Sequence, residues 1–149
     1  MKRILSLTLA LVALVSLVSL GLYAANDRVI QSKQLPKAAQ LFLAKHFAGR
    51  AVSLAKEDRD FSGTTYDVRL ADGTELEFTS AGEWKEVDGN HTALPLTFIP
   101  AQLVKIIQSQ HAGDAIVHIE RKRRGYQVEL ASGLELLFDA RFQLIGYDD

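Results

Sequence analysis

The sequence predicts an α+β protein made of two tandem repeats, each with one helix packed on a four-stranded antiparallel β-meander. Residues 66–78 (YDVRLADGTELEF) return at 126–138 as YQVELASGLELLF, with eight of thirteen positions identical. A segment copied within one chain is typical of a duplicated structural module. Ahead of each copy, a proline (Pro36, Pro100) is followed thirteen residues later by a glycine. Proline near the start and glycine just past the end are typical of a helix.

Residues 1–25 have the features of an export signal. Two basic residues are followed by an apolar stretch, Ile4 to Leu22, and then by the small pair Ala24-Ala25. This pattern predicts a secretory signal peptide that is cleaved after Ala24. The apolar stretch is also close to the length of a spanning helix, so an uncleaved membrane anchor is the alternative. The predicted divisions are a signal peptide (1–24), a first repeat (25–90) and a second repeat (91–149).

The composition limits the compartment and the partners. The chain has no cysteine, which excludes disulfides, a thiol nucleophile, thiolate metal ligands and a lipid-attachment cysteine after the signal. The formal net charge is −1, and it becomes more negative once Lys2 and Arg3 leave with the signal. Such a charge does not favour a nucleic-acid partner. We expect a soluble periplasmic protein with no membrane contact after signal cleavage.

Each repeat is expected to begin with a helix that has one apolar side. Ahead of the first helix, Val29-Ile30 favours a brief strand. Apolar residues at helical spacing predict the side that faces the core. They are Leu35, Ala39, Phe42, Leu43 and Phe47 in the first repeat, and Leu103, Ile106 and Ile107 in the second.

A strand follows each helix, at about 51–57 and 115–121. Its inward face is ambiguous, because Leu54 and His118 hold corresponding positions but differ in polarity. A β-bulge is one solution. The duplicated hairpin comes next, and Asp72-Gly73 would normally suggest a two-residue turn. We reject that register because it mixes polar and apolar side chains on the buried face.

A three-residue loop with a left-handed Gly73 instead keeps the apolar side chains of the hairpin on one face. The resulting pairs are Leu70 with Thr74, Val68 with Leu76 and Tyr66 with Phe78, then Leu130 with Leu134, Val128 with Leu136 and Tyr126 with Phe138. The same loop length in the next turn puts Trp84 opposite Phe78 and Leu144 opposite Phe138, facing inward. Phe142 replaces Gly82, which argues against a left-handed residue there. Residues 88–98 are expected to form a coupling strand between the repeats.

Four sequence features occur together in one known family. They are the Leu35-Pro36 helix start, the YxVxLxxGxExxF hairpin, the WKEVD strand at 84–88, and the second helix start at Ile99-Pro100. Over residues 35–149 the chain resembles the PepSY-like proteins, β-lactamase-inhibitor-like exported proteins of Gram-negative bacteria. The resemblance implies tandem helix-plus-sheet units, a non-enzymatic role, and inhibition or regulation of periplasmic enzymes or peptidases. The second repeat departs from it, with Leu144 and Tyr147 in place of Trp84 and Val87.

No catalytic motif is present, since the chain lacks GxSxG, HExxH, GxxxxGK[ST] and GxGxxG. His46 and His111 fall at the expected helix C-termini, where an imidazole can meet the last carbonyl groups. His91 and His118 lie apart from them. Residues 58–60 (DRD) resemble the start of a calcium loop but lack the glycine and glutamate that should follow. We therefore expect no enzymatic activity, no cofactor and no metal site.

The outward face of the predicted sheet distinguishes the two repeats. In the first repeat, Arg69 faces Glu75 and Glu77 faces Lys85, so opposite charges are paired. In the second repeat, Glu129 faces Glu135. This like-charge pair is unfavourable unless a cation such as Arg121 or Arg123, or a bound partner, neutralises it.

Beside this acidic pair, Leu137 is expected to face Ile145, and Glu135 to face Tyr147. The result is an apolar patch with an acidic edge, and such a patch is usually covered. The candidate partner-binding residues are Glu129, Glu135, Leu137, Ile145 and Tyr147. The patch could instead pack against the other repeat, against residues 27–34, or against a second chain.

Two functions follow from these features. The first is an exported, non-enzymatic binding or inhibitory module that engages a protein partner through its sheet surface. The alternative is a periplasmic small-ligand or cation (calcium) sensor in which Glu129 and Glu135 supply the charge.

Overall fold

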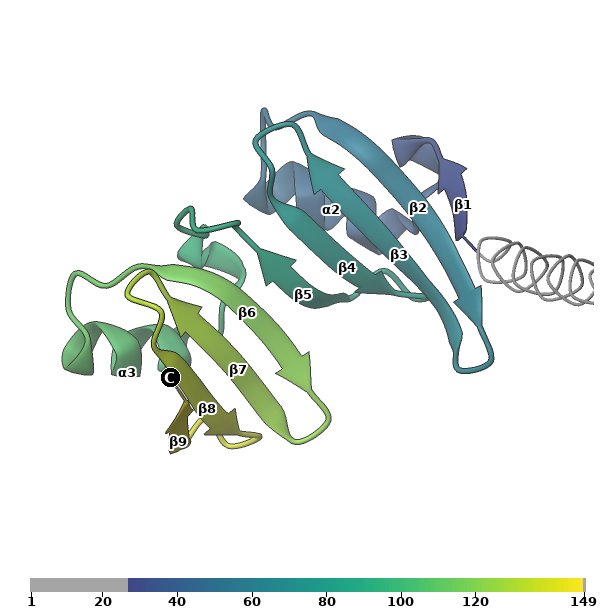
Figure 1. Ribbon diagram of the computed structural model, residues 1–149. Coiled ribbons are helices and arrows are strands. Elements are labelled where there is room, and N and C mark those ends of the chain that lie inside the picture. Colours follow the sequence, from purple (N-terminus) through teal and green to yellow (C-terminus); the bar gives the residue numbers. More distant parts are fainter. Residues whose placement is uncertain (1–26, 149) are drawn as a thin grey trace, which may run out of the picture.

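The computed structural model describes residues 27–148, which form nine strands, two α-helices and two short 3₁₀ helices (Figure 1). The predicted signal peptide and its cleavage site lie outside these residues. The strands are β1 (Asp27–Ile30), β2 (Val52–Asp60), β3 (Gly63–Leu70), β4 (Glu75–Thr79), β5 (Trp84–Asp88), β6 (Ile116–Lys122), β7 (Gly125–Leu130), β8 (Glu135–Asp139) and β9 (Leu144–Asp148). The helices are η1 (Ser32–Gln34), α2 (Lys37–His46), η2 (Leu96–Phe98) and α3 (Ala101–Gln110). Between residues 27 and 148, no helix has both the length and the apolar composition needed to cross a membrane.

The strands form one continuous antiparallel sheet in chain order from β1 to β9. The predicted fold class, two tandem helix-on-meander repeats, is therefore wrong. The finding that overturns it is the pairing of β5 with β6, through Glu86 with Glu120, Val87 with Ile119 and Asp88 with His118. A meander leaves the edge of its last strand with unpaired backbone groups, and here the next strand of the chain satisfies them.

The connection between β5 and β6 also differs from the prediction. No coupling strand forms in residues 88–98, because β5 and β6 pair with each other directly. Residues 89–95 instead turn back beside β6, where the Leu94 N–H donates to the Ile116 carbonyl oxygen over 2.8 Å. Leu94 is buried, so the connection closes the core below the β5–β6 junction.

Both α-helices begin and end as the sequence predicts. Pro36 and Pro100 are the N-cap residues, and the chain leaves each helix through Gly49 (φ +76°) or Gly113 (φ +80°). Glycine reaches this left-handed conformation without the steric penalty of a side chain. In Figure 1 both helices lie behind the sheet. One face of the sheet is thus covered, and the other is open.

The predicted hairpin registers are confirmed. Tyr66 pairs with Phe78 and Val68 with Leu76, and Tyr126 pairs with Phe138 and Val128 with Leu136. The Leu70 N–H donates to the Thr74 carbonyl oxygen (2.8 Å), which closes the three-residue loop around Gly73 (φ +93°). The bulge considered for the preceding strand is also present, at residues 52–54 of β2 and 116–118 of β6.

The next turn has the predicted pairs but an unexpected backbone conformation. Trp84 pairs with Phe78 and Leu144 with Phe138, as predicted. Phe142 nevertheless adopts a left-handed φ of +62° in the position that glycine holds at Gly82 (φ +82°). Its ring packs against Tyr126, with 5.6 Å between centroids. This packing offsets part of the backbone strain.

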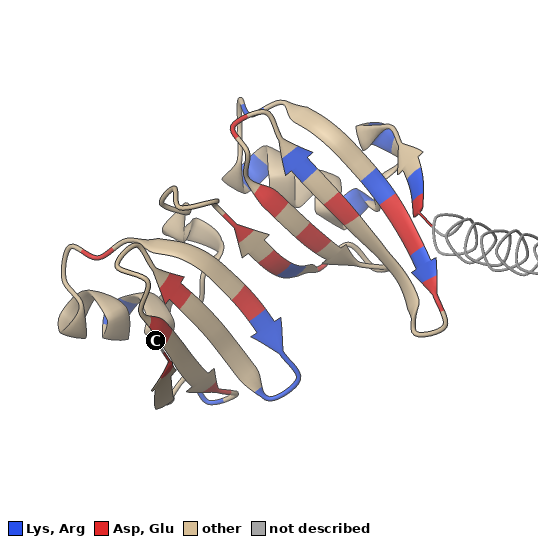
Figure 2. Cartoon of the chain, in the orientation of Figure 1, with Lys and Arg blue, Asp and Glu red and all other residues tan. Residues whose placement is uncertain are grey.

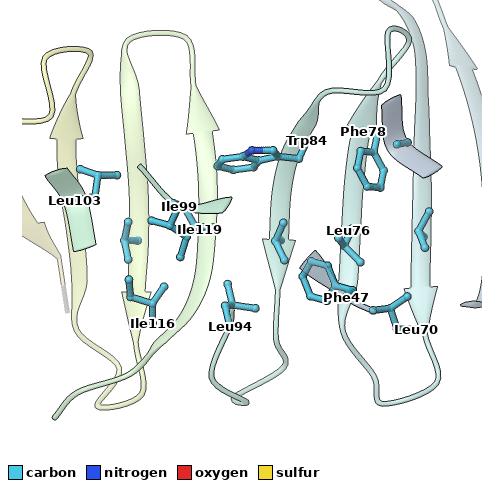
Figure 3. Packing of buried hydrophobic residues seen from close by; sticks show 14 of the residues in the cluster. Phe47, Leu70, Leu76, Phe78, Trp84, Leu94, Ile99, Leu103, Ile116 and Ile119 are labelled. Atoms are coloured by element: carbon cyan, nitrogen blue, oxygen red, sulfur yellow. The ribbon is translucent and has the colours of Figure 1, made fainter. Parts of the chain in front are cut away.

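The core is a single cluster that runs beneath the whole sheet (Figure 3). Trp84, only 5% exposed, lies where the two halves meet. Its ring contacts Phe98 from the connection (5.3 Å between centroids) and Tyr126 from β7 (6.4 Å). The Arg121 guanidinium of β6 stacks on the Trp84 ring at 4.0 Å. The tryptophan therefore joins the two halves through side chains, as the β5–β6 pairing joins them through the backbone.

Candidate binding surface on the open face of the sheet

Acidic residues occupy neighbouring positions on the middle strands of the sheet (Figure 2). They alternate with buried residues such as Val68, Leu76 and Val87, so their side chains lie on the face opposite the helices. Strand register places Asp67 beside Glu77, Glu77 beside Glu86, and Glu86 beside Glu120. Neighbouring strands lie about 4.8 Å apart, so four carboxylates from four strands form one line. Like charges in such positions repel, so basic neighbours are needed to neutralise the four carboxylates.

The basic neighbours are present over most of this row. Lys85 forms an ion pair with Glu77, and Lys122 forms one with Glu120. His118 Nε2 lies 2.8 Å from Glu86 Oε1. The hydrogen bond to Glu77 raises the pKa of the Lys85 ammonium, and the nearby charges of Glu120 and Glu86 raise it further. The centre of the open face is thus a network of alternating charges.

A groove of about 270 Å³ hollows this face above β2 to β5. Its lining includes five carboxylates and two basic residues: Asp67, Glu75, Glu77, Glu86 and Asp88, with Lys56 and Arg69. Burial within the groove raises the pKa of Asp67, and the nearby charge of Glu77 raises it further, against the attraction of Lys56. Asp67 is therefore the acid of the row whose negative charge is least completely neutralised by basic neighbours.

Glu129 and Glu135 face each other, as the sequence predicts. Gln127 Nε2 donates to Glu135 Oε2 over 2.7 Å. Within residues 27–148, no lysine or arginine forms an ion pair with either glutamate. Arg121, considered as a neutralising cation, stacks on Trp84 on the opposite face of the sheet instead. At the same place in the first half, Arg69 forms an ion pair with Glu75.

The predicted contacts of Leu137 and Glu135 with β9 are wrong by one residue. Leu137 faces Gly146 instead of Ile145, and Glu135 faces Asp148 instead of Tyr147. The cause is a bulge in β9, where the pairing shifts between Leu137 and Phe138. A bulge puts two residues of one strand opposite one residue of its partner, so every later pair moves.

The bulge also decides on which face the candidate residues lie. Ile145 holds the place of Lys85, which reaches Glu77 on the open face, so Ile145 (66% exposed) lies beside Leu137 there. Tyr147 pairs with the buried Leu136 and lies on the helix side, with its ring 6.1 Å from that of His111. The structure thus brings Glu129, Glu135, Leu137 and Ile145 together on the open face, and it places Tyr147 on the other face near the same edge.

The histidines do not form a common site. The His46 ring bonds to the Thr97 hydroxyl (2.7 Å) and not to the helix carbonyls, contrary to the predicted capping role. At the second helix, the backbone N–H of His111 meets the Ile107 carbonyl, while the ring Nε2 is buried without a hydrogen bond. Sequence reasoning missed the bond between His118 and Glu86, because the pairing of β5 with β6 creates it. In the part of the chain that the structure describes, no three His, Asp or Glu side chains converge to hold a metal ion.

The turn at residues 61–62, which follows β2, is closed by local hydrogen bonds to Asp60. Asp60 Oδ1 accepts bonds from the Ser62 N–H (2.7 Å), the Ser62 hydroxyl (2.6 Å) and the Gly63 N–H (3.1 Å). These bonds lower the pKa of Asp60, with the Ser62 hydroxyl as the largest cause. An aspartate that accepts bonds from its own turn is a common turn device. Residues 58–60 themselves are the last residues of β2 and pair with β3, so the expectation of a solvated turn at these residues is wrong.

These features define a class of protein: a long antiparallel sheet backed by helices on one face, with an open, acidic second face. The chain belongs to the PepSY-like family, since residues 64–146 match the family described as "Putative beta-lactamase-inhibitor-like, PepSY-like". The recognition made from the sequence is therefore confirmed. None of the curated proteins compared with the chain matches it.

Three solved structures from Bacteroides species are similar over most of their length. One, described as a putative calcium-regulated periplasmic protein from Bacteroides thetaiotaomicron, is 38% identical, with a TM-score of 0.79 over 83% of this chain and 97% of that chain. A putative periplasmic protein of the DUF2874 family from Bacteroides vulgatus is 35% identical, with the same TM-score and coverage. Another putative periplasmic protein from Bacteroides vulgatus, of unknown function, is 41% identical, with a TM-score of 0.78 over 83% and 99%.

Proposed function

We propose that the protein is an exported, non-enzymatic periplasmic module that binds and inhibits or regulates a protein partner through the open face of its second half. Three observations support this proposal. The family is described as β-lactamase-inhibitor-like, the solved relatives are described as periplasmic, and residues 1–25 resemble a signal peptide.

The observation that carries the proposal is the difference between two equivalent positions on the sheet. In the first half, Arg69 and Glu75 form an ion pair, whereas Glu129 faces Glu135 in the second half. Opposed carboxylates cost stability, so a chain that keeps them gains something elsewhere. A basic group on a partner that enters between them would turn the repulsion into attraction.

The neighbouring side chains fit the same partner. Leu137 and the exposed Ile145 supply apolar contact beside the two glutamates, where the first half has the Glu77–Lys85 ion pair. Interfaces commonly combine an apolar centre with charged groups that select the partner. The partner therefore presents an apolar side chain next to a lysine or arginine.

The test exchanges one residue for its counterpart in the first half. Glu129→Arg should create an Arg–Glu pair like Arg69–Glu75, so thermal stability should rise while partner binding falls by about tenfold or more. Binding is measured in cells with a photo-crosslinking residue at position 137, and position 77, its counterpart in the first half, is the control. A specific adduct at 137 that Glu129→Arg weakens supports the proposal. Equal adducts at the two positions would contradict it.

A second function is favoured by the acidic groove. Five carboxylates line it, the pKa of Asp67 is raised, and one solved relative is described as calcium-regulated. Here Ca²⁺ would bind in the groove near Asp67, with the weak dissociation constant of about 10⁻⁴ to 10⁻³ M that is typical of extracellular modules.

Calorimetry decides on this alternative. Binding of Ca²⁺ should release heat or raise the melting temperature. Asp67→Asn should remove the effect, whereas Asp60→Asn, at the end of β2 and outside the groove, should keep it. If millimolar Ca²⁺ changes neither quantity, the groove is not a cation sensor.

A further inference from the structure

We propose that the exposed edge of β9 accepts an extended segment of the protein partner as an added antiparallel strand. This inference rests on the proposed function and specifies how the partner is held. Among the strands of residues 27–148, β9 pairs with β8 alone. In Figure 1 it forms the border of the sheet beside α3.

The first half of the molecule contains an equivalent strand edge that is covered by another strand. β5 holds the same place in the first half as β9 does in the second, and β6 pairs with it. The effect of that cover is visible on corresponding residues: Val87 of β5 is 0% exposed, whereas Tyr147 of β9 is 54% exposed. Leu144, the counterpart of the buried Trp84, is also only partly buried. An added strand would cover these apolar side chains as β6 covers those of β5.

The backbone N–H and C=O groups of β9 are oriented for the pairing that β5 makes with β6. The Gly89 N–H donates to the Val117 carbonyl oxygen over 2.8 Å. Hydrogen-bonded and non-hydrogen-bonded pairs alternate along an antiparallel ladder, so Val87 also directs its N–H and C=O toward β6. Tyr147, its counterpart, directs these groups toward the open edge. Exposed groups of this kind are a ready template for an incoming strand.

The two faces of β9 determine the chemistry of the incoming segment. On the helix side, the incoming residue would contact Tyr147 and Leu144, so an apolar residue is favoured there. Ile119 has this role in the β5–β6 pair, where it faces Val87. On the open face, Gly146 has no side chain, so a lysine or arginine opposite it can extend across β9 toward Glu135. The segment therefore alternates a basic residue with an aliphatic one.

This charge preference selects a partner protein over a second copy of the chain. A second copy joined at this edge would pair its own β9 with β9, and residues 144–148 (LIGYD) include no lysine or arginine. Such a pairing would leave Glu135 without a basic partner. An extended segment that carries a lysine or arginine supplies one.

The probe is a labelled peptide with the sequence of residues 115–122 (AIVHIERK), the segment that covers β5. By analogy with the β5–β6 register, its Glu120 would lie opposite Gly146 and its Ile119 opposite Tyr147. We expect the peptide with Glu120→Lys to bind the exported full-length protein at least about tenfold more tightly than the parent peptide. Ile119→Pro in the peptide removes the N–H needed for pairing and should abolish binding. Fluorescence anisotropy measures all three peptides.

Two variants of the protein test the backbone pairing. Tyr147→Pro removes an N–H that the fold does not use, and proline is tolerated at such edge positions, so the protein should fold and lose peptide binding by about tenfold or more. Tyr147→Val restores the residue that β5 has at this place and should bind within about twofold of the wild type. Circular dichroism verifies that both variants are folded.

The outcomes separate this inference from the proposed function. If neither peptide binds at millimolar concentration, or if Tyr147→Pro binds as the wild type does, strand addition is overturned. The adduct at position 137 would then still support the proposed function. If the protein is dimeric and Tyr147→Pro makes it monomeric, the occupant is a second copy and the partner assignment is overturned. Loss of the adduct at 137 with intact peptide binding would overturn the proposed function alone.

Discussion

Individual charged residues are the clearest difference between the halves of the open face. Glu77, Glu86 and Glu120 each have a basic or imidazole partner within hydrogen-bonding distance. Glu129 instead faces Glu135 on one side, and on the other side it faces His118, whose ring is bonded to Glu86. Exposed ion pairs contribute little to stability. The distribution of charge on this face therefore affects partner selection more than folding.

Asp67 and Asp72 should respond to pH with opposite signs. The pKa of Asp67 is raised by burial and by Glu77, so its charge destabilises the fold at neutral pH. This penalty disappears as the pH falls from the raised pKa to the ordinary value of 3.8. The pKa of Asp72 is lowered by its hydrogen bonds with Thr74, and Arg50 adds to this effect, so its contribution is favourable above pH 3.8 and is lost as the pH falls through the lowered pKa.

Asparagine substitutions measure this difference. Asp67→Asn should raise the melting temperature at pH 7 by about 2 °C, and Asp72→Asn should lower it by a similar amount. Both differences should shrink toward pH 3, as thermal unfolding followed by circular dichroism would show. A fall in the melting temperature for Asp67→Asn at pH 7 would contradict the raised pKa.

At the scale of elements, the hairpins show how one turn can depend on tertiary packing. Gly63 and Gly125 open β3 and β7 with similar φ angles, +140° and +152°. A Cβ added at Gly63 would meet nothing within 4 Å, but at Gly125 it would lie 1.8 Å from the Phe138 carbonyl oxygen. The second hairpin is thus held against β8 at its tip, and the first is free there.

Alanine at the two glycines should therefore have unequal effects. Gly63→Ala brings only backbone strain and should cost about 1–2 kcal/mol. Gly125→Ala adds a clash with the backbone of β8 and should cost about 4 kcal/mol or more. Urea unfolding compares the free energies of unfolding. Equal losses would mean that β7 and β8 move apart easily at this tip.

At the scale of the whole molecule, one sheet and one core predict one cooperative unit. The β5–β6 pairing and the contacts of Trp84 cross the junction between the halves. Trp84 is the only tryptophan in the chain, so its fluorescence reports on this junction. Unfolding followed by fluorescence and by far-ultraviolet circular dichroism should give the same midpoint. A separate, earlier fluorescence transition would show that the halves come apart before they unfold.

Removal of the Trp84 side chain should be far more damaging than the same change at its counterpart. Trp84→Ala leaves a cavity between Phe98, Tyr126 and Arg121 and should cost about 3–5 kcal/mol. Leu144→Ala, at the partly exposed edge, should cost about 1–2 kcal/mol, because neighbouring side chains and water can fill the space. Chemical unfolding measures both values. Similar losses would mean that the junction is no better packed than the edge.

Much of the local structure could be predicted from the sequence. Pro36 and Pro100 marked the starts of the helices, and the alternation around Val68 and Val128 determined the hairpin register. These features depend on neighbours a few residues away. The opposed pair Glu129–Glu135 was predictable for the same reason, because it follows directly from that register.

The contacts of β9 could not be predicted in the same way. The bulge beside Leu144 moves one residue out of the ladder, and nothing in the identity of Ile145 or Gly146 marks it. The prediction therefore grouped Tyr147 with Leu137, whereas the structure puts these side chains on opposite faces. A single extra residue changes the face of every side chain after it.

The sequence by itself determined the duplicated hairpin, the two helix starts, the apolar faces and the acidic pair at Glu129 and Glu135. Only the tertiary structure decided that β5 pairs with β6, that Trp84 joins the halves into one core, and that β9 is left with an exposed edge. The reason is that the side-chain pattern of a strand specifies only which face is buried. Its backbone N–H and C=O groups are nearly the same for every residue, so they can pair with any strand that the rest of the fold brings alongside.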